Sequence, residues 1–256
     1  MNKVTIDYIK SLKQTSKSFS AITAYDYISA QIVDEAGIPL ILVGDSASMM
    51  VYGYNTTIPI SMDEMLLIIK AVSRGVKKSL IVADMPFLSY QPSVEETIKN
   101  AGKLIKEGNA HAVKIEGGKR VFDNISSLVD SGIPVMGHVG LTPQSYHQMS
   151  GYKMQGKTLK DAEKIIDDAH AVQESGAFSI VLECIPEKLA AQITEKLIIP
   201  TIGIGSGGAC DGQIQVFHDV VGLQKGNPPK HAMQTGHLYQ DALQIIQNYK
   251  SKVEKL

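Results

Sequence analysis

The stretch Leu80-Ile-Val-Ala-Asp84, followed by Ser93-Val-Glu-Glu96, contains the structural unit that decides the fold. The first part is an aliphatic run that ends in an aspartate, as expected of a strand covered on both faces of a parallel sheet. The second part has the form of a helix capping box, with Ser at the N-cap and Glu three residues later. Apolar residues then recur at helical spacing, at Val94, Ile98, Ala101 and Ile105. The stretch therefore predicts a strand followed by a helix.

The same unit recurs along the chain, without a linker or a break in composition. Eight units in 256 residues predict a closed barrel. An open doubly wound sheet is disfavoured because the first turn lacks a Gly-rich nucleotide fingerprint. We therefore expect an α/β protein with a single (β/α)₈ TIM-barrel domain over residues 1–256 and a short N-terminal helix. The expected strands are Phe19–Thr23, Leu40–Val43, Leu80–Ala83, Ala112–Ile115, Pro134–Gly137, Ile180–Leu182, Thr201–Ile204 and Val216–Val221.

The composition argues against several classes of protein. The 25 basic and 26 acidic residues give a net charge of −1 and form no basic stripe of the kind that binds nucleic acid. No stretch approaches the length of a membrane helix, and the N-terminus lacks the apolar core of a signal peptide. Two cysteines, Cys184 and Cys210, are too few for a disulfide framework. We therefore expect a cytoplasmic protein that binds neither nucleic acid nor a membrane.

Charged residues stand at the ends of five neighbouring expected strands. In a (β/α)₈ barrel, the carboxyl ends of the strands carry the active site. The clustering of carboxylates, a lysine and a histidine at this rim therefore predicts a catalytic site. These residues are Asp45, Asp84, Lys114, Glu116, His138 and Glu183.

Four carboxylates at one rim would repel one another unless a cation compensated them. Oxygen ligands suit Mg²⁺, whereas zinc is disfavoured because no closely spaced His/Cys set is present. For single residues, other interpretations remain open. Asp45 or Asp84 alone can be an ordinary helix N-cap, Lys114 and Glu116 can form a structural ion pair, and His138 can be a hydrogen-bonded core histidine.

The positions of Lys114, Glu116 and Glu183 suggest a reaction. Lys114 and Glu116 are two apart on one strand and point the same way, so they can serve a substrate anion and the metal shell. Glu183 lies nearly opposite Asp45 across the mouth, where it can move a proton while the cation stabilises negative charge on oxygen. This combination indicates enolate chemistry on a 2-oxo acid.

Two loops have features expected of a ligand site. The segment Gly140–Lys157 is long and lacks a clear element, which favours a lid. The glycines of Ile202–Gly208 resemble a phosphate-binding loop of a barrel, but they can equally serve a tight turn beneath a ligand.

With these residues laid out, the chain resembles the ketopantoate hydroxymethyltransferase (3-methyl-2-oxobutanoate hydroxymethyltransferase) family. The matching motifs run in order along nearly the whole chain. They are Thr23–Asp26, Val43–Ser46, Gly53–Thr57, Ala83–Phe87, Val113–Gly118, Gly137–Gln144, Gly151–Gly156, Leu182–Pro186, Ile202–Gly207 and Cys210–Gln213.

The resemblance implies a hydroxymethyl transfer from 5,10-methylenetetrahydrofolate to 3-methyl-2-oxobutanoate, with one Mg²⁺ per subunit. It assigns Asp45, Asp84 and Glu116 to the metal, directly or through water. Asp45 and Asp84 thereby also contact the bound substrate. Ser46 and Lys114 would bind the oxo-acid carboxylate, with His138 close by, and Glu183 would transfer the proton. Members of the family are cytosolic homo-oligomers, commonly decamers.

Three alternatives stay open. A Mg²⁺-dependent 2-oxo-acid lyase of the phosphoenolpyruvate/pyruvate barrel type would share the cation and the enolate but needs no folate. A barrel that binds a sugar phosphate at Gly203–Gly208 would work without metal and resist EDTA. A non-catalytic scaffold would have lost at least one strand-end carboxylate, yet all are present.

Overall fold

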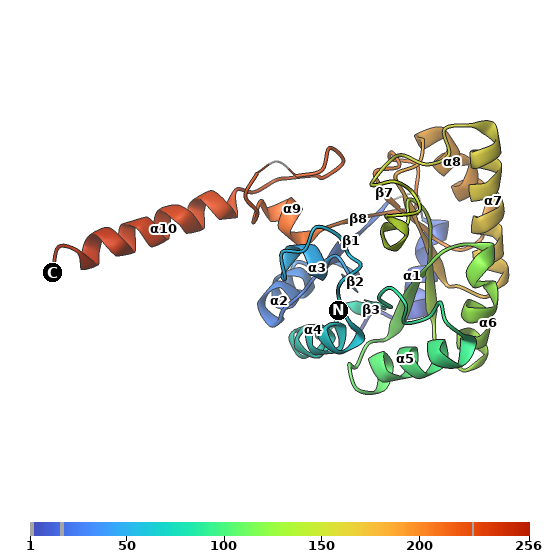
Figure 1. Ribbon diagram of the computed structural model, residues 1–256, viewed down its shortest axis with the longest axis horizontal. Helices are drawn as coiled ribbons and strands as arrows, with labels where there is room; N and C mark the ends of the chain where they lie inside the picture. Colours follow the sequence, from blue (N-terminus) through green and yellow to red (C-terminus); the bar gives the residue numbers. More distant parts are fainter. Residues whose placement is uncertain (1–2, 16–17, 227) are drawn as a thin grey trace. The chain divides into compact units, whose positions relative to one another are not determined.

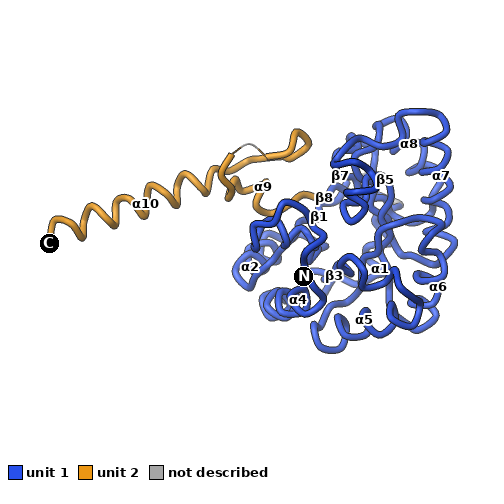
Figure 2. Tube along the Cα trace, in the orientation of Figure 1, with its two compact units in different colours: residues 1–214 blue, residues 215–256 orange. Residues whose placement is uncertain are grey.

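The computed structural model describes residues 3–15, 18–226 and 228–256. By their contacts the residues form two compact units, one up to Ile214 and one from Gln215 onward (Figure 2). Among the described residues, no helix is both long and apolar enough to cross a membrane. Both cysteines are free thiols.

Eight parallel strands close into a barrel in sequential order, so the predicted TIM barrel is confirmed. In the first unit, helices surround the strands (Figure 1). The strands are β1 (Phe19–Thr23), β2 (Leu40–Val43), β3 (Leu80–Asp84), β4 (Ala112–Glu116), β5 (Val135–Gly140), β6 (Ser179–Glu183), β7 (Thr201–Ile204) and β8 (Gly212–Gln215).

Helices follow most of the strands, and the expected short N-terminal helix is present. The helices of the first unit are α1 (Ile6–Ser11), α2 (Tyr27–Glu35), α3 (Ala47–Met50), α4 (Met62–Gly75), α5 (Val94–Lys106), α6 (Phe122–Asp130), α7 (Leu159–Glu174) and α8 (Glu187–Lys196), with 3₁₀ turns η1 (Leu12–Gln14), η2 (Lys119–Val121) and η3 (Pro143–Ser145). The second unit contains α9 (Phe217–Val221) and α10 (Leu238–Val253).

Local sequence signals explain where several helices begin. Ser61 and Glu64 form a reciprocal capping box at the start of α4, and Ser93, as expected, caps α5 by accepting a hydrogen bond from the backbone of Glu96. Asp26 caps α2 in the same way, with Ser29 as its reciprocal partner. These caps satisfy backbone N–H groups that have no partner inside the helix.

Glycine at a helix end commonly takes the left-handed conformation, and it does so after several helices here but not after α5. Gly37, Gly132 and Gly176 have positive φ angles, but after α5 it is Asn109 (φ 60°) rather than Gly108 that does so. At Gly108, an added Cβ would lie 2.5 Å from the carbonyl oxygen of Leu104. This glycine therefore allows a close approach to the helix end rather than a left-handed turn.

The prediction of an eighth strand at Val216–Val221 was wrong, because most of this segment forms helix α9. The strand comes earlier, at Gly212–Gln215, where a Cβ on Gly212 would lie 2.6 Å from the ring of Phe19. Valines favour a strand only where they pack within a sheet. The β-branched residues of this segment therefore led to a strand being predicted in the wrong place. The true strand has two glutamines and a glycine, which hide it from a search for aliphatic runs.

One buried apolar cluster fills the barrel interior. It takes residues from all eight strands, including Leu80 and Val82 of β3 and Met136 of β5, together with Ile9 from α1. Side chains alternate along a strand, so positions two residues further on face the same interior. Continuing this inward row toward the carboxyl ends gives Asp84 on β3, Lys114 and Glu116 on β4, His138 on β5 and Glu183 on β6. The fold therefore stacks a charged layer directly on an apolar core.

Candidate active site

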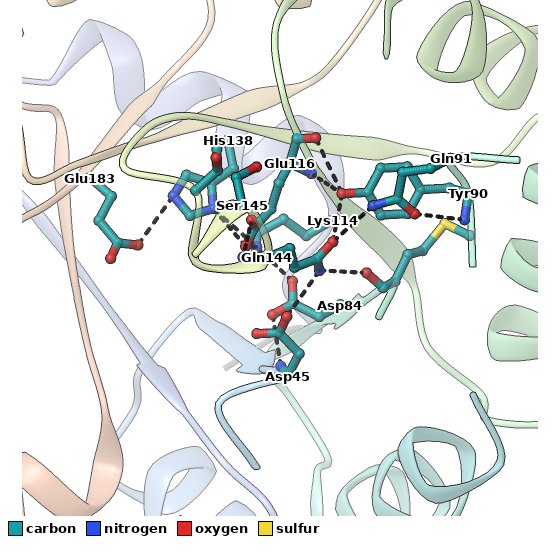
Figure 3. Close-up of polar contacts among 12 residues, drawn as sticks. Asp45, Asp84, Tyr90, Gln91, Lys114, Glu116, His138, Gln144, Ser145 and Glu183 are labelled. Atoms are coloured by element: carbon teal, nitrogen blue, oxygen red, sulfur yellow. Dashed lines mark hydrogen bonds and ion pairs between the residues drawn. The ribbon is translucent and has the colours of Figure 1, made fainter. Parts of the chain in front are cut away.

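Strand register brings the charged layer together. Asp84 pairs with Lys114 between β3 and β4, and Glu116 pairs with His138 between β4 and β5. Glu183 follows on β6, opposite Gly140. Figure 3 shows these side chains converging with Asp45, which lies just beyond the end of β2. The six charged residues predicted from strand ends thus form one contiguous group.

Lys114 is the cation at the centre of this group. Its Nζ lies 2.8 Å from Oδ1 of Asp84 and 3.6 Å from Oε1 of Glu116, and it lies 3.2 Å from Nδ1 of His138. Burial opposes its charge, but the carboxylates of Asp84 and Glu116 outweigh burial and raise the pKa of Lys114. Lys114 is therefore charged at neutral pH and fixed by its neighbours.

Asp45 and Asp84 are a close, buried acidic pair. The backbone N–H of Asp45 donates to Oδ2 of Asp84 at 2.9 Å. Burial, and then the charges of Asp84 and Glu116, raise the pKa of Asp45 well above its ordinary value. Burial also raises the pKa of Asp84, against the opposing effect of Lys114. With only one lysine nearby, ionisation of both carboxyls is disfavoured, and a further cation would stabilise the doubly ionised pair.

Glu116 differs from the two aspartates. Burial opposes its ionisation, but Lys114 and His138 outweigh burial and lower the pKa of Glu116. Its Oε2 accepts a hydrogen bond from the backbone N–H of Gln144 at 3.0 Å. Its other oxygen, Oε1, is buried and has no hydrogen-bond partner. One oxygen of Glu116 is thus anchored and the other is left to ion contacts.

His138 connects Glu116 to Glu183. Its Nδ1 lies 3.5 Å from Oε1 of Glu116, and its Nε2 lies 3.1 Å from Oε2 of Glu183. Burial and the charge of Lys114 disfavour the protonated ring, but contacts with both carboxylates outweigh them and raise the pKa of His138 to about 9. The Glu183 side chain is 15% exposed, whereas His138 is buried. Glu183 therefore stands at the accessible edge of the group.

Ser46 follows Asp45 at the start of α3. Its Oγ lies 2.7 Å from the hydroxyl of Tyr25. The residue before Asp45 is Gly44, where an added Cβ would lie 2.7 Å from Oγ of Ser46 and 3.5 Å from Oδ2 of Asp84. The glycine therefore leaves room for both polar side chains at the end of β2.

The donor set fits a small, hard cation. All candidate ligands are carboxylate oxygens; Oδ1 of Asp84 and Oε1 of Glu116 are buried and have ion contacts with Lys114, and Glu116 also with His138. Within the described residues, no group of three or more His, Cys, Asp or Glu side chains is placed so that it could hold a metal ion. Mg²⁺ commonly takes only one or two protein carboxylates and fills its other positions with water and substrate. The Asp45–Asp84 pair meets that requirement, with Glu116 nearby.

Three residues near this group were not predicted as site residues. Gln144 on η3 and Tyr90, in the loop between β3 and α5, are buried and bond to one another beside Glu116. Tyr152 is partly exposed, and burial, followed by the charges of Asp45 and Glu183, raises the pKa of Tyr152 to about 12. They lie on loops, so a search for polar residues at the ends of predicted strands does not find them. A buried Gln in a Thr-Pro-Gln turn after β5 was the available signal.

The segment Gly140–Lys157 lies beside the site. Leu141 N–H donates to the carbonyl of Glu183, and Gln155 N–H donates to that of Cys184, so both ends of the segment are attached to β6. A cavity of about 490 Å³ adjoins the segment, with Gln144 in one wall and Phe87 and Arg120 among its other lining residues. A lid role for the segment stays a prediction.

The glycine loop after β7 serves packing. A Cβ on Gly207 would lie 2.4 Å from the side chain of Glu187, and Oε1 of Glu187 accepts a hydrogen bond from Gly208 N–H. A phosphate on this loop would meet the negative charge of Glu187. The tight-turn interpretation of Ile202–Gly208 is therefore favoured over a phosphate site.

Comparisons with solved structures support the fold. The phosphoenolpyruvate phosphomutase from Streptomyces platensis subsp. rosaceus superposes with a TM-score of 0.65 at 12% identity, covering 98% of this chain and 87% of that one. A phosphonopyruvate hydrolase complex with oxalate and Mg²⁺ superposes with a TM-score of 0.64 at 13% identity, covering 100% and 88%.

Comparisons of sequence are more specific. The 3-methyl-2-oxobutanoate hydroxymethyltransferase of Carboxydothermus hydrogenoformans is 51% identical over 255 residues, which cover 100% of this chain and 92% of the relative. That of Dehalococcoides mccartyi is 51% identical over 253 residues, which cover 99% and 91%. The model of the ketopantoate hydroxymethyltransferase family matches residues 3–256. The chain therefore belongs to the ketopantoate hydroxymethyltransferase family of transferase enzymes.

Proposed function

We propose that this enzyme transfers a hydroxymethyl group from 5,10-methylenetetrahydrofolate to carbon 3 of 3-methyl-2-oxobutanoate, giving 2-dehydropantoate (ketopantoate). This is the first step of pantothenate and coenzyme A biosynthesis. The observation that carries the proposal is the buried charged layer, in which the Asp45 and Asp84 carboxyls, both with a raised pKa, stand beside Lys114. Such a layer suits a 2-oxo acid, which has both a carboxylate to bind and an acidic neighbouring C–H bond.

Asp45 and Asp84 would hold one Mg²⁺ ion, and Glu116 would join them directly or through a water. When bound, the ion supplies positive charge that stabilises an enolate oxygen. The phosphonopyruvate hydrolase that shares this fold was solved as a complex with oxalate and Mg²⁺, which supports this choice of metal. Lys114 and Ser46 would bind the substrate carboxylate. Lys114 is suited to this because its charge is maintained by its neighbours.

Glu183 would accept the proton from carbon 3. Its contact with His138 at 3.1 Å orients the carboxylate, and its partial exposure leaves an oxygen accessible to substrate. In the transfer, the C–H bond at carbon 3 breaks and a C–C bond to the one-carbon unit forms. Water supplies the hydroxyl group, and the two folate nitrogens each regain a proton as their bonds to that carbon break, one proton coming from carbon 3 and one from the water.

We further propose that the enzyme is a cytoplasmic homo-oligomer, with ten chains as the expected number. The apolar residues of α10 support self-association, because Ile245, Ile246 and Tyr249 are each more than 60% exposed. Its other partners would be the small-molecule substrates.

The second candidate is a Mg²⁺-dependent 2-oxo-acid lyase of the phosphoenolpyruvate/pyruvate type. It is favoured only by the fold, which this chain shares with a phosphoenolpyruvate phosphomutase and a phosphonopyruvate hydrolase at 12–13% identity. The 51% identity to named hydroxymethyltransferases weighs against it. A lyase would act without folate, so omission of the folate distinguishes the two reactions.

The test is exchange of the carbon 3 hydrogen of 3-methyl-2-oxobutanoate with solvent deuterium, followed by NMR with and without Mg²⁺ and the folate. We expect exchange with Mg²⁺ alone, and 2-dehydropantoate only when the folate is added. Exchange at full rate in EDTA would contradict the metal assignment. Turnover without folate would contradict the transferase assignment.

A further inference from the structure

Gln144 contacts two of the proposed metal carboxylates at once. It lies on η3, after β5, and is buried. Its side-chain Nε2 donates to Oδ2 of Asp45 at 2.9 Å and to the carbonyl oxygen of Met85 at 2.9 Å. Its backbone N–H donates to Oε2 of Glu116 at 3.0 Å. One residue thus connects carboxylates that follow β2 and end β4, as Figure 3 shows.

Tyr90 sets the orientation of this amide. Its hydroxyl, which is buried, donates to Oε1 of Gln144 at 2.7 Å. The same hydroxyl accepts a hydrogen bond from the backbone N–H of Glu116 at 3.3 Å. Because Oε1 is fixed toward Tyr90, the NH₂ group faces Asp45 and Met85. A flipped amide would direct its oxygen at the Asp45 carboxylate, which is repulsive.

We propose that Gln144 is a positioning residue for the metal site, oriented by Tyr90. It binds one oxygen of Asp45 and one of Glu116, so the other oxygen of each carboxylate is the one left to the cation or its water shell. The inference rests on the proposed function, because it takes these carboxylates as metal ligands. A neutral amide suits this role because it stabilises the carboxylates without a positive charge that would compete with the metal.

The main experiment measures Mg²⁺ affinity of the full chain by calorimetry, with Mn²⁺ binding by EPR as an independent readout. Groups that hydrogen-bond metal ligands typically change metal affinity by roughly 10- to 100-fold when removed. We expect that loss for Gln144→Leu, which keeps the approximate size and removes the two hydrogen bonds that Nε2 donates and the two that Oε1 accepts. Unchanged affinity in a folded Gln144→Leu enzyme would overturn the inference.

The matched control is Gln91→Leu. Gln91 makes the same kind of contact with Gln144 Oε1, at 3.3 Å, but from an exposed position. Its loss removes an amide without touching a carboxylate, so we expect Mg²⁺ affinity within about two-fold of the parent. An equal loss in this control would mean that the affinity responds to any disturbance of the loop, and would overturn a specific role for Gln144.

Tyr90→Phe tests the orientation step and remains informative if Gln144→Leu fails to fold. The Tyr90 hydroxyl bonds to Gln144 and to backbone atoms of Glu116 rather than to the Glu116 carboxylate. Any effect of Tyr90→Phe on the carboxylates should therefore pass through Gln144 or that backbone. We expect Mg²⁺ affinity about 3- to 10-fold weaker in Tyr90→Phe, within the range for outer groups of metal sites. In the Gln144→Leu background the same change should have no further effect on affinity, because coupled residues are not additive.

The outcomes distinguish failure of the proposed metal site from failure of the positioning role of Gln144. Fully additive losses in the double variant would overturn the link from Tyr90 through Gln144. If the parent enzyme showed no saturable Mg²⁺ binding, with or without 3-methyl-2-oxobutanoate, the proposed metal site itself would fail. Metal binding in the parent that is unchanged by Gln144→Leu and by Tyr90→Phe would overturn the positioning role alone.

Discussion

At the scale of single residues, Glu183 is the carboxylate with the best access to a substrate. It pairs with His138 at 3.1 Å while its side chain is 15% exposed. Glu183→Gln removes the base but keeps the size, so exchange of the carbon 3 hydrogen should slow by roughly 10²- to 10⁴-fold. Binding of the oxo acid, followed by calorimetry, should change little. Normal rates of both exchange and transfer would exclude Glu183 from the mechanism.

Asp84 combines a proposed metal contact with the partner of a buried lysine. We expect Asp84→Asn to lose roughly 10²-fold or more in turnover, because the variant has lost a charge that stabilises the cation. Asn retains an oxygen that can accept from Lys114, which lies 2.8 Å from Asp84. Asp84→Ala would take from that buried lysine its nearest carboxylate and leave only the longer contact with Glu116 at 3.6 Å, so the variant should also unfold more easily, by about 3–5 kcal/mol.

Calorimetry of the parent and both variants checks this prediction, since only Asp84→Ala should show the large loss of stability. Retention of full metal-dependent turnover by Asp84→Asn would contradict the assignment. The ion pair with Lys114 thus gives Asp84 a role in stability in addition to its proposed role at the metal.

The sequence was a good guide to residues at strand ends and a poor one to residues on loops. Asp84, Glu116 and Glu183 were predictable because a strand's direction and side-chain period fix where its last residues point. Gln144 and Tyr90 were not, because a loop brings a residue to a site through contacts distant in sequence. Their bond spans 54 positions in the chain.

At the scale of elements, Asp34 attaches the end of α2 to the start of β3. Its carboxylate accepts hydrogen bonds from the backbone N–H groups of Lys77, Lys78 and Ser79 and from the Ser79 hydroxyl. Burial opposes ionisation, but these hydrogen bonds outweigh it and lower the pKa of Asp34. Asp34→Asn loses several charge-assisted hydrogen bonds and should reduce the free energy of unfolding by about 2–4 kcal/mol at pH 7.

The pH dependence of this effect has a defined sign. Because the pKa of Asp34 is lower in the folded state, its contribution is complete above the unfolded-state pKa of about 3.9 and is lost as the pH falls through the folded-state pKa. Urea unfolding of both proteins between pH 7 and pH 3 measures it. The difference in stability should shrink at the acidic end. A constant difference would show that Asp34 acts through packing instead.

Gly137 allows strand β5 to pack closely against helix α7. An added Cβ at this position would lie 2.2 Å from Cγ1 of Val172 on α7. Gly137→Ala should therefore destabilise the fold by about 1–3 kcal/mol, the usual cost of overpacking a core. Adding Val172→Ala should recover part of the loss by making room, which thermal unfolding of the single and double variants would detect. If the two losses simply add, the steric explanation is wrong.

The elements themselves were largely predictable, and the exceptions share one physical cause. The first seven strands contain short runs of mostly apolar residues, so hydrophobicity locates them. The eighth, Gly212–Gln215, is set by the approach of Gly212 to the Phe19 ring, a contact between distant parts of the chain. Likewise Asn109, not Gly108, turns the chain after α5. Local patterns fail where tertiary contacts decide.

At the scale of the whole molecule, eight repeats of one unit close into a barrel whose inward rows change from apolar to charged toward one end. This arrangement explains how 256 residues can combine a stable core and a reactive layer. The core below is filled by aliphatic side chains, so the charged side chains above it can reach solvent and substrate only at the carboxyl rim. Closure of the barrel thus determines where the chemistry occurs.

Helix α10 has an exposed apolar side that could form a contact between subunits. Its apolar residues Leu238, Ile245, Ile246, Tyr249 and Val253 fall on one side of the helix, and each is at least 44% exposed. An exposed apolar stripe of this length is typical of a protein interface. We therefore expect Ile246→Glu to place a charge in a contact between subunits and to shift the enzyme to a smaller species.

Light scattering after size exclusion measures the mass of the assembly. The matched control is Gln247→Glu, which introduces the same charge on the opposite side of α10 and should leave the mass unchanged. If the interface also supports the active site, dilution of the Ile246→Glu enzyme should reduce its specific activity while the control keeps it. An Ile246→Glu enzyme with the mass of its parent would remove α10 as the assembly surface, because a buried unpaired carboxylate at an apolar contact is strongly destabilising.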